Sequence, residues 1–231
     1  MKLRVALAVA VFVVAGAPGA PSQAATRKQA RARRHHTCAV PASRVIARDR
    51  DVVVYSLPAV AHALGPGGVA ACFTHGGTPV TLSPARARYL RVSVSHVVLA
   101  GSVVAYLQTS SGIDSGTTSL EVVDVRRRRV LRSAPAGGYA DAGFVFSQGV
   151  TSLVVAPDGA VAWIVERGRL RSPTEGIWVY AAAPTGPVAL LDEGNDIGPE
   201  SLSLSGRTLS WWHAGTLRSA PLPALAPRSG G

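Results

Sequence analysis

The sequence predicts an all-β protein made of about four antiparallel, four-stranded units, the last of them incomplete. A pattern of strand, polar turn, strand and aromatic residue recurs four times along the 231 residues. The segments between these turns are short, rich in Val, Leu, Ile and aromatic residues, and separated by Gly, Pro, Asp and Ser, as is typical of strands in hairpins. Beyond the N-terminal segment, no stretch shows a sustained helical period. Four-stranded units repeated about every 50 residues are typical of β-propeller blades, so the fold class is a β-propeller-like array.

The aromatic residue of each copy sets the period of the repeat. Tyr55, Tyr106, Trp163 and Trp211 each follow a polar turn and are 51, 57 and 48 residues apart. We expect each of them on the second strand of its unit, pointing the same way and packing between neighbouring units. In the fourth copy, where Trp211 and Trp212 are adjacent, the pattern leaves open which one faces inward.

The strands of the first two copies follow in chain order. The first copy has VIARDRDVVVYS (45–56), VAACFTH (69–75) and TPVTLS (78–83). The second has VVLAGSVVAYLQ (97–108), TSLEVVDV (118–125) and VLRSA (130–134), with the turn RRRR between the last two.

The last two copies repeat the pattern, and the fourth is shorter. The third copy has VVAPDGAVAWIV (154–165), GIWVYAA (176–182) and PVALLDE (187–193). The fourth has LSLSGRTLSWWH (202–213) and TLRSAPL (216–222) before a Pro-rich tail, so its outer strand is missing. A small closed ring, completed by CAVPAS (38–43), and an open array both fit this pattern.

The third copy also resembles a known family. The segment APDGAVAWIVERGRLRSPTEGIWVYAAAPTGPVALL (156–191) is similar to a blade of the TolB-type or WD-repeat-like β-propellers, as found in secreted bacterial repeat proteins. It shares their Pro-Asp-Gly turn, the small-aromatic pair after it and the Thr-Gly turn before the outer strand. The resemblance implies the fold and a habit of binding partners, and it transfers no catalytic residue. The chain departs from these proteins, which close with six or seven blades, in having four copies.

The N-terminal segment has the three parts of a secretory signal peptide. Lys2 and Arg4 precede an apolar stretch over 5–17, and small residues follow, so we expect residues 1–25 to be removed after Ala24 or Ala25. The alternative, an N-terminal membrane anchor, would require about 20 apolar residues. We therefore expect a secreted protein, extracellular or in the cell envelope, that does not span the membrane.

Positive charge is concentrated in a short segment after the predicted signal. The net charge is +11, but from Cys38 onward 17 Arg face 13 Asp and Glu, a difference of +4. Residues 26–37 form a basic arm without large apolar residues, which predicts disorder before a folded domain over 38–223 and a flexible tail over 224–231. The arm is either a solvated linker or a nonspecific contact for polyanions, so we expect no specific nucleic-acid site.

Two cysteines, Cys38 and Cys72, remain in the predicted mature chain. In an oxidising compartment such a pair predicts one disulfide. Two separate buried thiols are the alternative.

The long connections predict where binding takes place. In a four-stranded unit, the loop between the second and third strands and the link to the next unit leave from the same end. At that end the segments 56–68, 109–118, 135–149, 166–176 and 192–200 are long, whereas the other turns are tight. Long loops on a rigid scaffold often bind ligands, although they are also tolerated as insertions. The charged residues of this candidate binding face are Asp114, Asp141, Arg167, Arg169, Arg171, Asp192, Glu193 and Asp196.

Three charged groups each have two interpretations. The acidic segment DEGNDIGPE (192–200) is either a solvated loop or a Ca²⁺ site, but it lacks the regular calcium-loop spacing. The arginines of 167–171 either pair with that segment or receive an anionic ligand. The RRRR turn (126–129), at the tight-turn end, is either solvated or an anion site.

Catalytic signals are weak. The histidines lack zinc-site spacing, FSQG (146–149) lacks the context of a nucleophile elbow, and no glycine-rich loop opens a helix. We therefore expect no cofactor or metal, and a non-enzymatic binding module for a protein or a cell-envelope glycan. The alternative is a propeller-type hydrolase or lyase acting on carbohydrate or lactone, with Asp141, Asp192 and Asp196 as its carboxylates.

Overall fold

The computed structural model describes residues 38, 40–58, 68–83, 86–87, 90–112, 115–140, 146–169 and 174–224. The predicted signal peptide and the basic arm lie outside the described residues, as do most of the predicted tail and several connections of the candidate binding face. Within the described residues, no helix has the length and apolar character needed to cross a membrane.

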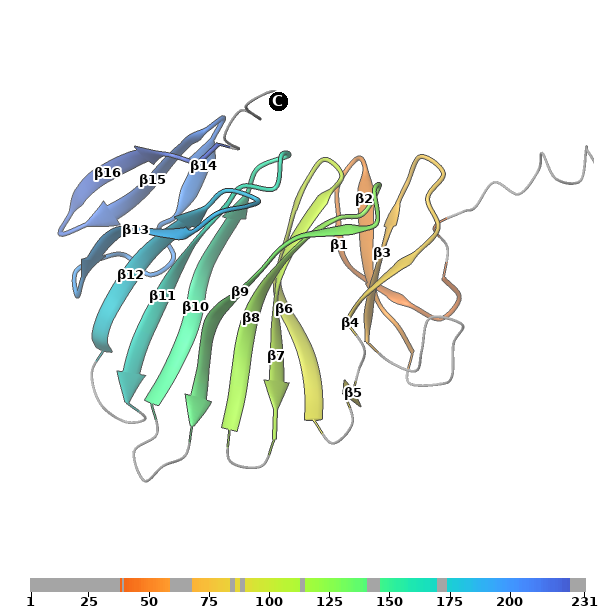
Figure 1. The fold of residues 1–231 in the computed structure, drawn as a ribbon, viewed down its shortest axis with the longest axis horizontal. Coiled ribbons are helices and arrows are strands. Elements are labelled where there is room, and N and C mark those ends of the chain that lie inside the picture. Colours follow the sequence, from red (N-terminus) through yellow and green to blue (C-terminus); the bar gives the residue numbers. More distant parts are fainter. Residues whose placement is uncertain are drawn as a thin grey trace, which may run out of the picture. The chain divides into compact units, whose positions relative to one another are not determined.

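The strands form four antiparallel units in chain order, with four strands in each of the first three units and three in the last (Figure 1). The short β5 (Arg86–Ala87) precedes unit 2 and pairs with its first strand. Unit 1 contains β1 (Arg44–Arg48), β2 (Val52–Ser56), β3 (Val69–Phe73) and β4 (Val80–Ser83). Unit 2 contains β6 (Leu90–Ala100), β7 (Val103–Ser111), β8 (Ser115–Asp124) and β9 (Arg129–Ala140). Unit 3 contains β10 (Phe146–Val155), β11 (Val161–Arg169), β12 (Thr174–Ala182) and β13 (Val188–Gly194). Unit 4 contains β14 (Ser203–Ser205), β15 (Thr208–His213) and β16 (Thr216–Pro221).

Every ladder joins strands that are neighbours in the sequence. Units 1 and 4 are separate sheets, whereas units 2 and 3 are joined by three residue pairs between β9 and β10 into one nine-stranded sheet that includes β5. Among the described residues of 38–43, no strand is added to unit 4, and the described strands form no closed ring. The all-β fold with an incomplete last unit is therefore confirmed, and among the described residues the array is open.

The four repeat aromatics occupy equivalent strands, as predicted. Tyr55 lies on β2, Tyr106 on β7, Trp163 on β11 and Trp211 on β15, the second strand of each unit, and each is 2–3% exposed. Trp212, by contrast, is 50% exposed. Adjacent residues of a strand point to opposite faces, so Trp211 is the inward residue of the fourth copy.

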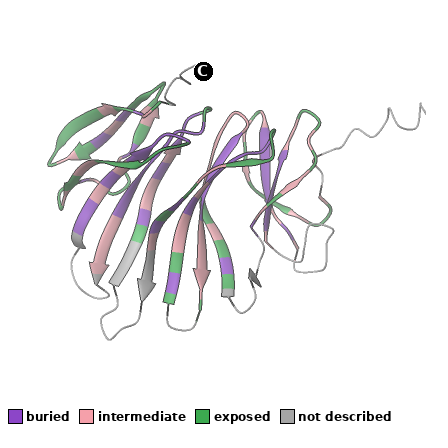
Figure 2. Cartoon of the chain, viewed as in Figure 1, coloured by how far each residue is buried: buried purple, intermediate pink, exposed green. Residues whose placement is uncertain are grey.

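The aromatics also face the same way. Tyr106 packs with Val52 and Val54 of unit 1, Trp163 with Leu120 of unit 2, and Trp211 with Ile164 of unit 3. Each therefore packs against the preceding unit. Among the described residues no unit precedes unit 1, and the cluster around Tyr55 is joined by Cys38 and Val40 instead. Figure 2 shows the buried residues, which lie mainly on the middle strands of the units, such as β2 and β3 of unit 1.

Polar contacts add to this packing at each junction between units. The Tyr106 hydroxyl donates to the Leu82 carbonyl of unit 1 at 2.8 Å. The Arg132 guanidinium of unit 2 donates to two carbonyls of the β12–β13 turn in unit 3 at 2.8 Å. Arg207 of unit 4 pairs with Asp158 of unit 3 at 2.6 Å. Each unit is thus fixed to its neighbour by apolar packing and by at least one polar contact.

The outer face of unit 4 differs from the faces buried between units. Cross-strand pairs on this face include Ser203 with Ser210 and Ser210 with Ser219, alongside Trp212 with Leu217. The positions of β11 in unit 3 that correspond to Ser210 and Trp212 are Ala162 and Ile164, both fully buried. The outer face of unit 4 therefore combines serine pairs with the exposed Trp212 and Leu217.

The long connections are shorter than the sequence suggests. The strands β7 and β8 extend into the predicted loop 109–118, as β9 and β10 extend into 135–149 and β11 and β12 into 166–176. Thr109 pairs with Thr118 across the β7–β8 ladder, and their hydroxyl groups are 2.9 Å apart. Backbone pairing therefore continues through segments whose Ser, Thr and Gly content suggests loops, because tertiary context overrides local propensity.

Candidate functional site

The candidate binding face is only partly described. Asp114, Asp141 and Arg171 lie outside the described residues, and of Arg169 only the backbone is described, at the end of β11. Arg167 is half-buried on β11, opposite Gly176. Asp192 and Glu193 lie on β13, and Asp196 follows in the link to unit 4.

Asp192 is the centre of a polar network between units 3 and 4. Its side chain is 7% exposed. The Oδ2 atom accepts hydrogen bonds from His213 Nδ1 at 2.8 Å and Trp211 Nε1 at 2.7 Å. The Oδ1 atom accepts from the Arg218 guanidinium at 2.7 Å and the Glu193 backbone N–H at 3.0 Å. Both carboxylate oxygens are therefore engaged.

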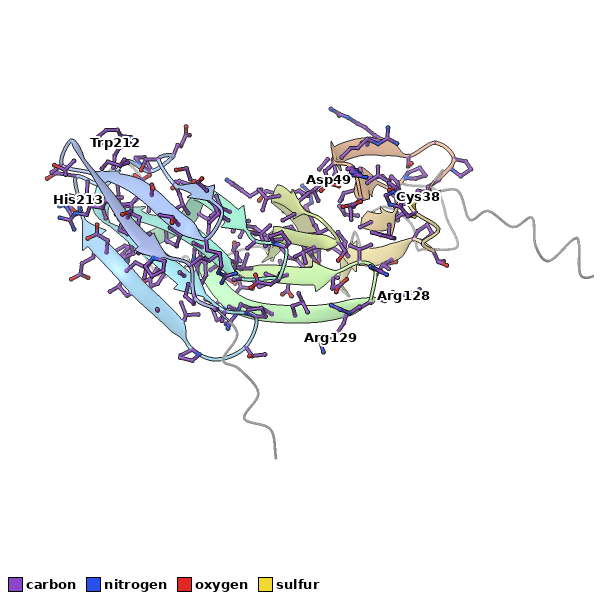
Figure 3. All side chains as sticks on the ribbon, turned by 90° about the horizontal axis from the view of Figure 1, so that it is seen from above. Cys38, Asp49, Arg128, Arg129, Trp212 and His213 are labelled. Carbon is purple, nitrogen blue, oxygen red and sulfur yellow. A yellow bond between two sulfur atoms is a disulfide. The ribbon has the colours of Figure 1, made fainter. Side chains whose placement is uncertain are left out.

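This network determines the orientation of His213. An ionised carboxylate only accepts hydrogen bonds, so Nδ1 carries the proton in the bond to Asp192. A Cβ atom added to Gly194 would lie 2.9 Å from His213 Nε2, so the absence of a side chain at Gly194 makes room for the imidazole. Figure 3 shows His213 beside the exposed Trp212.

The link between β13 and β14 is also fixed by backbone contacts. The Ala214 N–H donates to the Asp196 carbonyl at 2.9 Å, and the Gly198 N–H donates to the Trp212 carbonyl at 2.9 Å. The Trp212 N–H donates to the Ser201 hydroxyl at 3.0 Å. The acidic segment of the candidate binding face is thus held against β15 rather than projecting as a free loop.

Glu193 and Asp196 keep exposed side chains on this segment. Within the described residues, no three His, Cys, Asp or Glu side chains come close enough to share a metal ion. The acidic residues therefore differ in environment. Asp192 lies in the junction between units 3 and 4, while Glu193 and Asp196 face solvent.

Sequence reasoning missed His213, Trp211 and Arg218 as partners of Asp192. We considered the arginines of 167–171 as the partners of the acidic segment, but the ion pair of Asp192 is with Arg218 on β16. The alternation of side chains along β15 and β16 could have identified Arg218, because it places Trp211 opposite Arg218 on the face toward unit 3.

The Asp192–His213 pair resembles the orienting pair of a nucleophilic active site, but other features of that chemistry are missing from the described part. No hydroxyl or thiol among the described residues forms a hydrogen bond with His213 Nε2. Both oxygens of Asp192 are also engaged by structural donors. The geometry is that of a junction between units.

No protein-family model matches this chain, and no curated protein shows significant similarity to it. The resemblance to TolB-type or WD-repeat-like propellers remains an expectation from residues 156–191.

The contacts of Asp192 predict how the free energy of unfolding depends on pH. Burial alone would raise the pKa of Asp192, but hydrogen bonds from His213 and Trp211 and the positive charges of His213 and Arg218 outweigh it and hold that pKa below its usual value. A depressed carboxyl pKa contributes stability above the unfolded-state value of about 3.9, and this stability is lost as pH falls through the folded-state pKa. We therefore expect Asp192→Asn to lower the free energy of unfolding by about 2–3 kcal/mol at pH 7, with the difference shrinking below about pH 4.

Urea unfolding between pH 7 and pH 3 measures this effect. Asp196→Asn is the control, because the Asp196 side chain is exposed and only its backbone carbonyl contacts unit 4. A difference between wild type and D192N that stays constant down to pH 3 would contradict the role of the Asp192 charge.

Proposed function

We propose that this chain is an exported, non-enzymatic binding module. In this proposal its four units are the blades of a β-propeller-like open array, and the candidate binding face recognises a protein or a cell-envelope glycan. The Cys38–Cys72 disulfide supports export, because structural disulfides persist in oxidising compartments. The basic arm, residues 26–37, adds nonspecific contact with polyanions.

The observation that carries the proposal is the rigid display of Glu193 and Asp196. Their segment is anchored by the four hydrogen bonds to Asp192 and by backbone contacts to β15. Exposed charged residues on a fixed backbone lose little conformational freedom on binding, so their contacts contribute more to affinity than those of a flexible loop.

Binding to cell envelopes tests this proposal. The mature chain is mixed with insoluble bacterial envelope fractions at physiological salt, and the bound fraction is measured after sedimentation. Protease treatment of the envelopes removes protein partners, and muramidase treatment removes glycan partners. We expect one treatment to abolish binding, and we expect Glu193→Gln with Asp196→Asn to weaken it.

Two controls separate this face from other surfaces. Asp51→Asn changes one acidic residue at the tight-turn end and should leave binding unchanged. A chain without residues 26–37 measures the contribution of the basic arm. Binding that is lost with the arm and unaffected by the Glu193 and Asp196 substitutions would overturn the proposal.

The second candidate function is an enzyme acting on carbohydrate or lactone, which the Asp192–His213 pair favours. Among the described residues, no hydroxyl or thiol bonds to His213 Nε2, which favours binding over this alternative. Turnover of chromogenic glycosides or lactones that is abolished by His213→Gln, in a variant that still folds, would favour the enzyme.

A further inference from the structure

A pocket opens at the tight-turn end, away from the candidate binding face. Its volume is about 500 Å³, within the range of about 300–1,000 Å³ typical of small-molecule sites. Two turns from different units form it, the β3–β4 turn of unit 1 and the β8–β9 turn of unit 2. Its lining residues are Phe73, His75, Gly76, Gly77, Thr78, Val125, Arg126 and Arg128.

The charges that line this pocket are positive. Arg126 and Arg128 come from the RRRR turn, and no Asp or Glu belongs to the lining. Between them, Arg127 is held at the buried Asp124, with its guanidinium 3.0 Å from Oδ2 and its backbone N–H 3.0 Å from Oδ1. The turn therefore uses one arginine for its own structure and contributes the two flanking arginines to the pocket.

Neither pocket arginine has a carboxylate partner among the described residues. Arg126 lies over the Phe73 ring, with the guanidinium carbon 5.7 Å from the ring centroid. On the opposite wall, His75 Nδ1 contacts the Thr74 hydroxyl at 3.2 Å and Asp51 at 3.5 Å. This leaves His75 Nε2 and the Thr78 hydroxyl as further polar groups for a ligand.

Both turns that form the pocket have backbone positions that favour glycine. Gly76 has φ +105°, which favours glycine, and a Cβ atom added to Gly77 would lie 2.8 Å from the Phe73 carbonyl oxygen. Arg128 has φ +54°, in the left-handed region that glycine and asparagine prefer. The turn thus has an arginine at a position where glycine would be easier to accommodate. Figure 3 shows Arg128 and Arg129 at the end of this hairpin.

We propose that this pocket binds a small ligand that carries a phosphate group, of about the size of a sugar phosphate. Guanidinium groups present paired N–H donors that match the oxygens of a phosphate, and charge-assisted hydrogen bonds are the stronger ones. Two arginines suit the nearly doubly negative charge of a phosphate monoester better than the single charge of a carboxylate. The volume leaves room for an organic group, which would meet Phe73 and Val125.

This site is independent of the proposed function. It lies on turns at the other end of the units, and it shares no residue with the candidate binding face. The proposed function gives the basic arm a contact with polyanions, so the test uses small phosphates rather than polymers.

Titration calorimetry of the full mature chain at low ionic strength tests the proposal. The probes are inorganic phosphate, glycerol 3-phosphate and glucose 6-phosphate, with unphosphorylated glucose as the reference. Arg128→Gly removes one pocket cation and places glycine at a positive φ, so it should preserve the fold. Arg126→Gln removes the other cation. The matched control is Arg129→Gln, an exposed arginine of the same run that does not line the pocket.

We expect wild type to bind at least one sugar phosphate more tightly than inorganic phosphate, and glucose not at all. Each pocket substitution should weaken that binding about tenfold, whereas R129Q should leave it within about twofold. Thermal unfolding in the absence of ligand should show R128G as stable as wild type. Absence of binding to all three phosphates, or equal losses in R128G and R129Q, would overturn the proposal. If the sugar phosphates do not bind but the chain still binds cell envelopes, the pocket proposal fails while the proposed function stands.

Discussion

Replacing Trp163 with alanine is expected to lower the free energy of unfolding by about 3–5 kcal/mol. Trp163 is 2% exposed and belongs to the cluster between units 2 and 3. It packs with Leu120 and stacks on Tyr180, with ring centroids 5.6 Å apart. The substitution removes this apolar contact and leaves a cavity that the paired strands cannot close.

Denaturant unfolding of Trp163→Ala and Trp212→Ala compares the stability lost with a buried indole to that lost with an exposed one. Both substitutions remove an indole from the second strand of a unit, but Trp212 is half-exposed, so its loss should cost less than about 1 kcal/mol. Similar losses for the two variants would show that the junction between units 2 and 3 contributes little, and would contradict the repeat-based assignment of the core.

Removal of the disulfide has the second-largest expected effect. Cys38 and Cys72 are bonded, as predicted, with Cα atoms 5.6 Å apart and a sequence separation of 34 residues. In the chain-entropy model, a loop of this length is worth about 4 kcal/mol, because the bond restricts the unfolded chain. We expect Cys38→Ala with Cys72→Ala to lose most of that stability. Alanine is chosen because Cys72 is fully buried and a serine there would bury a hydroxyl group.

Reduced wild-type protein provides an internal comparison for the double variant. Its denaturation midpoint should fall to that of the variant, since both lack the same bond. A double variant as stable as the oxidised protein would mean that residues 38–43 are held against β2 and β3 by packing alone.

The strands and their inward faces could be predicted because strand alternation is a local property. The turn-to-aromatic spacing located the second strand of every unit, and the burial of Tyr106 and Trp163 follows from it. Adjacent tryptophans were different, because Trp211 and Trp212 fit the period equally well. The packing of unit 4 against unit 3 distinguishes them, because it buries Trp211 and leaves Trp212 exposed.

The two polar sites could not be predicted because each depends on contacts between units. Asp192 meets His213 and Arg218 only after units 3 and 4 pack together, and no local pattern encodes that packing. In the same way, the RRRR turn fits either a solvated turn or an anion site, and no local pattern distinguishes the two. The pocket arises from its position beside the β3–β4 turn, about 50 residues earlier in the chain.

The pairing of strands in strict chain order has a consequence for how the chain reaches its folded state. All ladders of the described residues join consecutive strands, so each pairing step closes a short loop and loses little chain entropy. Pairing between consecutive strands is local, and local contacts favour rapid folding. Each hairpin can form as soon as its own residues are available, and each completed unit offers an apolar face on which the next can form. The N-terminal units can therefore become compact before the C-terminal residues exist.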